Sequence, residues 1–175
     1  MSQRKGLVQL FTGEGKGKTS AALGTVLRAA GHNLKVYIIF FMKADSAHGE
    51  IAALRQLPTV EIARYGGIKF VDPNHIKPED IAKAREALGA AREAMLSGKY
   101  DLIVLDELSI ATAFRLVDLD EVIKLIKDKP PAVELIITGR YADPRLVEAA
   151  DLVTEMLKIK HPYDRGVPPR KGIEY

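Results

Sequence analysis

Cysteine is absent from the 175-residue chain, its net charge is small, and its apolar runs are short. Without cysteine the protein can form no disulfide, bind no metal through thiolates and use no cysteine nucleophile. The 26 lysine and arginine residues against 23 aspartate and glutamate residues give +3, too little to indicate nucleic-acid binding by charge alone. Apolar runs such as residues 36–42 are too short to span a bilayer. These absences argue against a disulfide scaffold, a nucleic-acid binder and a membrane-spanning protein.

Histidines are few and scattered: His32, His48, His75 and His161. No two are four residues apart and no HExxH-like pattern occurs, so a histidine zinc site is not expected. Residues 1–5 lead directly into an apolar run, which leaves no room for a signal peptide. With 47% apolar and 28% charged residues, the composition is that of an ordinary globular protein. We expect one cytoplasmic domain covering residues 1–175.

One segment, residues 7–20 (LVQLFTGEGKGKTS), has the layout of a Walker A phosphate loop. A strand-like run opens onto a glycine-rich turn, and a helical segment rich in Ala and Leu follows. Glycines adopt positive φ and let backbone N–H groups face a polyphosphate, while the helix N-terminus adds partial positive charge. The predicted phosphate-binding residues are Gly13, Glu14, Gly15, Lys16, Gly17, Lys18, Thr19 and Ser20.

Two side chains of this loop carry specific chemistry. Lys18 supplies a mobile full charge, and the Thr19 hydroxyl is a ligand for Mg²⁺. The strict pattern has glycine where this chain has Thr12. A glycine-rich turn without a ligand is the alternative, but it would have to explain the glycines, lysines and hydroxyl at these offsets. The pattern therefore favours nucleotide binding.

A second segment, residues 102–107 (LIVLDE), is an apolar strand that ends in two acids. A phosphate-loop site needs a carboxylate at the tip of a neighbouring strand to hold Mg²⁺ or Mn²⁺. We predict Asp106 and Glu107 as metal ligands together with Thr19. An isolated acid pair would more simply cap a helix, but the preceding loop favours the metal. Glu107 either positions an attacking water, as in hydrolytic relatives, or shares the metal.

Arg140 follows the predicted fifth strand, at the edge where open α/β sheets bind ligands. A guanidinium there would steady a phosphate or the charge on a leaving group. A surface ion pair is the alternative, and sequence position does not separate the two.

Strand-like and helical segments alternate along the rest of the chain. Strands are predicted at 36–42, 59–65, 101–106, 132–138 and 151–157, and helices at 49–57, 78–98, 118–126 and after 143. The alternation predicts an α/β fold of the P-loop NTPase-like (RecA-like) class, with a three-layer α/β/α arrangement around a mostly parallel sheet of about six strands. Residues 158–175 hold three prolines and five basic residues, and are predicted to extend over the domain as a non-helical tail.

Several motifs together resemble one family. They are TGEGKGKT at 12–19, VLDEL at 104–108, ITGR at 137–140 and KHPYDRG in the tail, which ends in KGIEY. In combination they look like the ATP:corrinoid adenosyltransferases of the P-loop type over nearly the whole chain. The resemblance implies that the Co(I) of a reduced corrinoid such as cob(I)alamin attacks C5′ of ATP, forming a cobalt–carbon bond and releasing triphosphate. It also implies a reversed nucleotide in the loop, a homodimer and a flavoprotein or flavodoxin-type reductant.

The resemblance assigns roles to residues already singled out. Co(I) is a strong nucleophile that needs no general base, so Lys18, Glu107 and Arg140 would act on the departing triphosphate and its metal. The family often has a Gly-Phe-Thr-Trp-like run after the third strand, where this chain has GIKF at 67–70. We therefore predict corrinoid contacts from Ile68, Phe70 and His161. An apolar surface there would disfavour a lower axial ligand and ease reduction of cobalt. Because few residues precede the first strand, we expect the family's N-terminal cover to be missing or built otherwise.

The sequence leaves two alternatives to an adenosyltransferase. A hydrolytic P-loop ATPase or small-molecule kinase would use Glu107 and release ADP. A RecA-like nucleic-acid partner would need a larger basic footprint than +3 and would bind with steep salt dependence.

Overall fold

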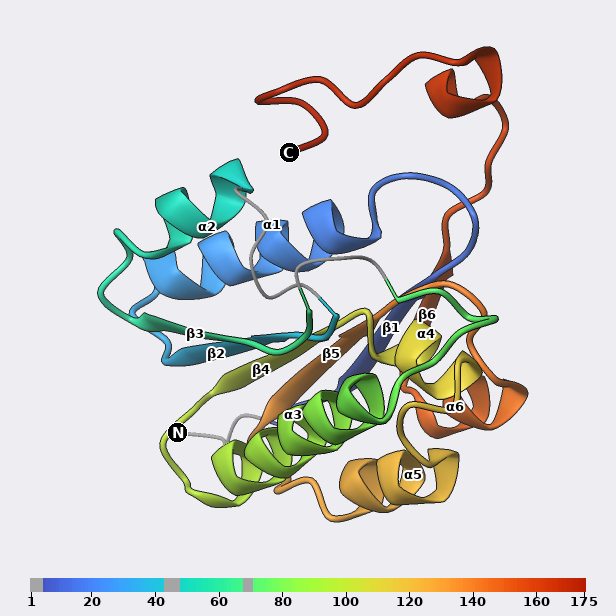
Figure 1. Cartoon of the computed structure of the whole chain (residues 1–175). Helices are drawn as coiled ribbons and strands as arrows, with labels where there is room; N and C mark the ends of the chain where they lie inside the picture. Colours follow the sequence, from blue (N-terminus) through green and yellow to red (C-terminus); the bar gives the residue numbers. More distant parts are fainter. Residues whose placement is uncertain (1–4, 43–47, 68–70) are drawn as a thin grey trace.

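The computed structural model describes residues 5–42, 48–67 and 71–175. Six strands form one sheet in the order β3-β2-β4-β5-β1-β6, and every neighbouring pair is parallel (Figure 1). The strands are β1 (Val8–Thr12), β2 (Val36–Phe40), β3 (Val60–Arg64), β4 (Leu102–Asp106), β5 (Glu134–Thr138) and β6 (Leu152–Glu155). The predicted parallel sheet is confirmed.

One or two helices follow each of the first five strands, and a 3₁₀ turn follows β6. The helices are α1 (Lys18–Gly31), α2 (Gly49–Leu54), α3 (Pro78–Leu96), α4 (Leu108–Ala113), α5 (Leu119–Lys127) and α6 (Pro144–Ala149), and the 3₁₀ turn is η1 (Pro162–Arg165). The sequence did not predict α4. Its N-cap, Glu107, is left-handed (φ 65°) and makes no side-chain cap, so the usual signal for a helix start is missing.

Alternate residues of the strands pack against helices on opposite faces of the sheet. Leu102 and Val104 of β4 belong to the cluster under α1 and α2, whereas Ile103 and Leu105 belong to the cluster with α3, α4, α5 and α6. Figure 1 shows α1 and α2 on one side of the sheet and α3 and α5 on the other. The period of two places successive side chains on opposite faces, which explains why these strands are almost continuously apolar. The three-layer α/β/α class is confirmed.

The strand order decides where the functional segments meet. β5 lies between β1 and β4, in register through Phe11↔Thr138 and Leu105↔Ile137. Because the strands are parallel, the segments that follow β1, β4 and β5 leave from the same edge. The phosphate loop, the acid pair and Arg140 are therefore brought together by topology, at the edge where α/β proteins bind ligands.

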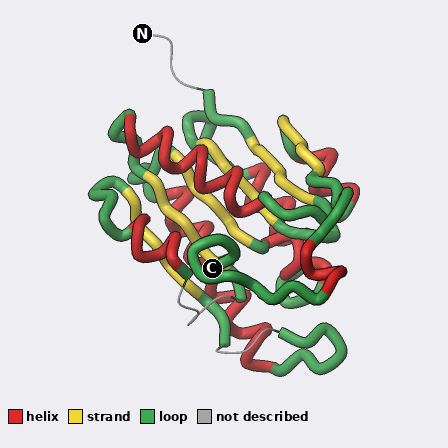
Figure 2. Tube along the Cα trace, turned by 90° about the horizontal axis from the view of Figure 1, so that it is seen from above, coloured by secondary structure: helices red, strands yellow, loops and turns green. Residues whose placement is uncertain are grey.

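Residues 158–175 leave the domain after β6 and remain mostly exposed. Figure 1 shows this segment (red) rising away from the sheet, turning through η1 and returning on the side of α1, and Figure 2 shows the C-terminal end over the body of the molecule. Among the described residues, no helix is long and apolar enough to cross a membrane.

Candidate active site

The phosphate loop joins β1 to α1 and is held in place by the chain that follows β6. Met156 N–H donates to Thr12 O at 2.8 Å, and Gly15 N–H donates to Met156 O at 2.6 Å. A Cβ on Gly13 would lie 2.5 Å from Met156 O, and one on Gly15 would lie 2.7 Å from Leu157 O. Gly13 also has φ +97°. These two glycines are thus required by the neighbouring backbone as well as by any phosphate.

Lys18 is folded back over its own loop. Only 8% of it is exposed, and its Nζ donates to the carbonyls of Gly13 and Gly15, both at 2.7 Å. Burial is the main reason that the pKa of Lys18 lies below its ordinary value, and Arg140 adds to this effect. The nearby carboxylates, Glu107 first, act in the opposite direction. The two hydrogen bonds place Lys18 Nζ in the loop that would receive a polyphosphate.

Asp106, Thr19 and Thr138 form a hydrogen-bonded group beneath the loop. Asp106 is 1% exposed, and its Oδ1 accepts from Thr19 Oγ1 at 2.9 Å and from Thr138 Oγ1 at 2.7 Å. The Thr138 hydroxyl in turn accepts the backbone N–H of Glu107 at 3.0 Å. This network fixes the acid pair against the end of β5. Sequence reasoning gave Thr138 no role, because a threonine that ends a buried strand carries no signal of its own.

The predicted metal ligands are one hydroxyl, Thr19, and two carboxylates, Asp106 and Glu107. Thr19 and Asp106 are in direct contact, and Thr19 and Glu107 both line the cleft described below. Hard oxygen donors of this kind suit Mg²⁺, which is held by few protein ligands and its own waters. Within the described ranges no group of three or more His, Cys, Asp or Glu could hold a metal alone. The residues fit a Mg²⁺ ion that is shared with a nucleotide.

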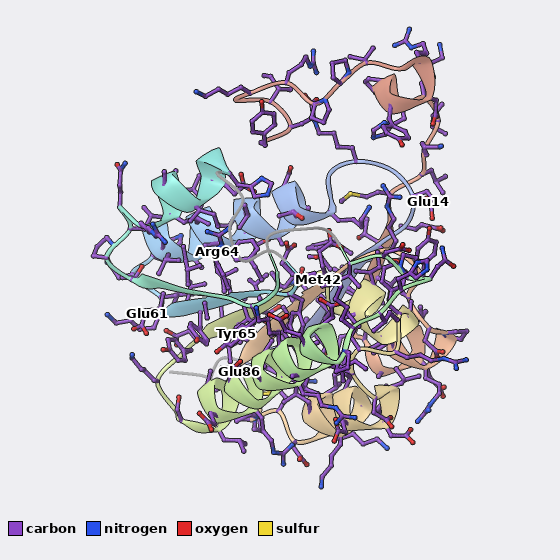
Figure 3. All side chains as sticks on the ribbon, viewed as in Figure 1. Glu14, Met42, Glu61, Arg64, Tyr65 and Glu86 are labelled. Atoms are coloured by element: carbon purple, nitrogen blue, oxygen red, sulfur yellow. The ribbon has the colours of Figure 1, made fainter. Side chains whose placement is uncertain are left out.

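Arg140 makes an ion pair, which is one of the two alternatives given for it, while its role toward a phosphate stays a prediction. Its Nη1 lies 3.6 Å from Glu14 Oε2, and it also lines the cleft. Figure 3 shows Glu14 at the outer bend of the phosphate loop. Glu14 was predicted to bind phosphate, but its half-exposed carboxylate pairs with the guanidinium, so only its backbone N–H suits a phosphate.

A cleft of about 470 Å³ opens above the loop. Among the predicted site residues, Glu107, Arg140 and His161 line this cleft. Six predicted residues of the loop and its helix line it as well: Gly15, Lys16, Gly17, Lys18, Thr19 and Ser20. The structure adds two walls that the sequence did not predict, His48 to Glu50 at the start of α2 and Gly172 to Tyr175 at the end of the tail. Ile68 and Phe70, predicted to contact the corrinoid, lie outside the described residues.

The signals for these two walls are weak in the sequence. His48 is a lone histidine before a six-residue helix, and its buried Nδ1 has no hydrogen-bond partner among the described residues. The tail residues follow three prolines, and nothing in their composition indicates that they return to the loop.

Comparison with known proteins identifies the family. Residues 4–175 match the family model described as ATP:corrinoid adenosyltransferase BtuR/CobO/CobP. The chain belongs to this family. A corrinoid adenosyltransferase of Pseudomonas aeruginosa is 37% identical over 171 residues, covering 98% of this chain and 84% of the relative.

Two further relatives that are named corrinoid adenosyltransferases show similar coverage. A corrinoid adenosyltransferase of Escherichia coli is 34% identical over 98% of this chain and 86% of its own. The corrinoid adenosyltransferase CobA of Salmonella typhimurium is 32% identical over 99% and 87%. The predicted resemblance is confirmed, and with it the assignment of the chain to the transferases. The hydrolase or kinase alternative finds no support in these comparisons.

Proposed function

We propose that this adenosyltransferase uses its phosphate loop to hold the triphosphate of ATP while a reduced corrinoid takes the adenosyl group. The electron pair of Co(I) forms the cobalt–C5′ bond, the C5′–oxygen bond breaks, and its pair leaves on the triphosphate. The observation that carries this proposal is the buried Lys18 ammonium, held at 2.7 Å from two loop carbonyls. Its charge needs little rearrangement to meet the leaving group, which is how preorganised sites lower barriers.

The remaining residues act on the same leaving group. Arg140, two residues after the end of β5, lines the cleft where the negative charge grows, together with loop residues 15–18. Thr19, Asp106 and Glu107 would hold Mg²⁺, which supplies further neutralising charge at the phosphates. Because Co(I) needs no base to attack carbon, Glu107 serves in this proposal as a metal-site residue.

Corrinoid contacts stay a prediction for Ile68 and Phe70. His161 is better supported, because it lines the same cleft as Lys18 and Arg140. Its Nδ1 accepts the Tyr163 N–H at 3.2 Å, which leaves Nε2 as the nitrogen for a ligand. We further propose a cytoplasmic homodimer whose corrinoid substrate is reduced to Co(I) by electrons from a flavoprotein or flavodoxin-type reductant, as the family resemblance implies.

The test is an assay with ATP, Mg²⁺ and chemically reduced cob(I)alamin. We expect a light-sensitive alkylcobalt product and inorganic triphosphate in equal amounts. ADP and phosphate, formed without an alkylcobalt product, would instead favour hydrolysis through Glu107. Omitting the reductant is the control, because Co(II) and Co(III) corrinoids lack the nucleophile.

A further inference from the structure

The C-terminal tail closes one side of the cleft and is tied there through the phosphate loop itself. Lys16 Nζ donates to Glu174 Oε1 at 2.8 Å and to the carbonyl of Ile173 at 3.4 Å. These two contacts join positions more than 150 residues apart, since their separations are 158 and 157. The apolar side chain of Ile173 is 62% exposed, so apolar packing of that residue does little to hold the tail in place.

Glu174 is prepared for this contact by its own segment. Arg170 donates to it three times, from its backbone N–H at 2.8 Å, from Nε at 3.1 Å and from Nη2 at 2.9 Å. Arg170 is the main reason that the pKa of Glu174 lies far below its ordinary range, and Lys16 adds to the effect. The three Arg170 contacts therefore favour the charged carboxylate and orient it independently of Lys16.

The same lysine is a predicted phosphate ligand. Lys16 lies between Gly15 and Gly17 in the loop, and its side chain is 49% exposed at the mouth of the cleft. A triphosphate brings several negative charges to that place, where Glu174 already holds one. Like charges that share one ammonium repel each other, so the phosphate and the carboxylate compete for Lys16.

Loss of Lys16 would leave the tail internally satisfied. Glu174 keeps the guanidinium of Arg170, and Gly172 N–H keeps its bond to Tyr175 O at 2.7 Å. The tail therefore releases the loop without exposing an unpaired charge. The exchange needs no rearrangement inside the segment.

We propose that Glu174 is a positioning residue that acts through Lys16, holding it away from the phosphates in the free protein and taking it back as triphosphate leaves. This inference rests on the proposed function, because it requires a polyphosphate in the loop. It assigns the last residues of the chain a part in setting nucleotide affinity and triphosphate release.

Isothermal titration of the full-length protein with inorganic triphosphate and Mg²⁺ tests the proposal. Glu174→Gln should tighten triphosphate binding by about two- to five-fold, the range of a partly exposed ion pair. The matched control is Asp164→Asn, which removes a tail carboxylate paired with Lys158 at 3.0 Å and should bind like wild type. Weaker or unchanged binding by Glu174→Gln would overturn the proposal.

A double-mutant cycle separates action through Lys16 from a general charge effect. In a Lys16→Met background the Glu174→Gln substitution should no longer change triphosphate affinity. If the tightening persisted there, Glu174 would act on the phosphates directly and the positioning role would be wrong. Should wild type fail to bind triphosphate at all, the proposed function would fall first, whereas binding without any Glu174 effect removes this inference alone.

Discussion

At the scale of single residues, the site depends on a few polar groups that are buried and already paired. Lys18 is held by carbonyls of its own loop, and Asp106 accepts two threonine hydroxyls. Groups fixed in this way make their contribution to catalysis without reorganising during the reaction. They also make the fold sensitive to their loss, because a partner left behind is buried and unsatisfied.

Lys18→Ala should reduce the rate of adenosylation by roughly 10²- to 10³-fold, the usual loss when one preorganised donor to a developing charge is removed. The measurement is kcat with saturating ATP and reduced corrinoid. Lys83→Ala is the control, because Lys83 lies on α3 and pairs with Glu79 at 2.8 Å. Near-normal turnover of Lys18→Ala would show that the loop has no catalytic use.

Thr138→Val should lower the free energy of unfolding by about 1–3 kcal/mol, since the buried Asp106 Oδ1 loses one of its two hydroxyl donors and the Glu107 N–H loses the hydroxyl that accepts it. Urea denaturation measures the change. Thr138→Ser keeps the hydroxyl and should recover most of the stability. If serine cost more stability than valine, the methyl group, which valine keeps and serine lacks, would matter more than the hydrogen-bond network.

At the scale of elements, the sequence of the phosphate loop explains its layout but not the contacts that hold it in place. Glycines and lysines at the right offsets predicted the Walker A layout and its place between strand and helix. They did not reveal that residues 156–157 press against Gly13 and Gly15, because that contact joins segments far apart in the chain. The helix α4 was missed for a related reason: its start is fixed by packing after β4 and not by a capping side chain.

Gly13→Ala should cost about 1–3 kcal/mol of stability and weaken triphosphate binding, because a Cβ meets Met156 O at 2.5 Å and φ is +97°. Thermal unfolding and titration with triphosphate measure the two effects. Gly24→Ala is the matched control, since no atom of the described residues lies within 4 Å of a Cβ at this position in the middle of α1. There alanine should stabilise by about 0.4–1 kcal/mol. Equal behaviour of the two variants would refute the steric argument.

At the scale of the whole molecule, strand order assembles the site from distant segments. β5 separates β1 from β4, so the loop, the acid pair and Arg140 meet at one sheet edge. Alternating strands and helices were enough to predict this fold class and the meeting of these residues. The course of the tail was only partly predictable, since its prolines exclude a helix but do not say that Glu174 returns to Lys16.

In the proposed reaction, residues 13–19 bind the three phosphates while carbon C5′ faces the corrinoid. The most direct measurement is a crystal structure of the protein with ATP and Mg²⁺. We expect the triphosphate to lie in the loop, with Lys18 Nζ close to its present position and in contact with phosphate oxygens. A structure with the loop empty and the triphosphate bound elsewhere would contradict the account.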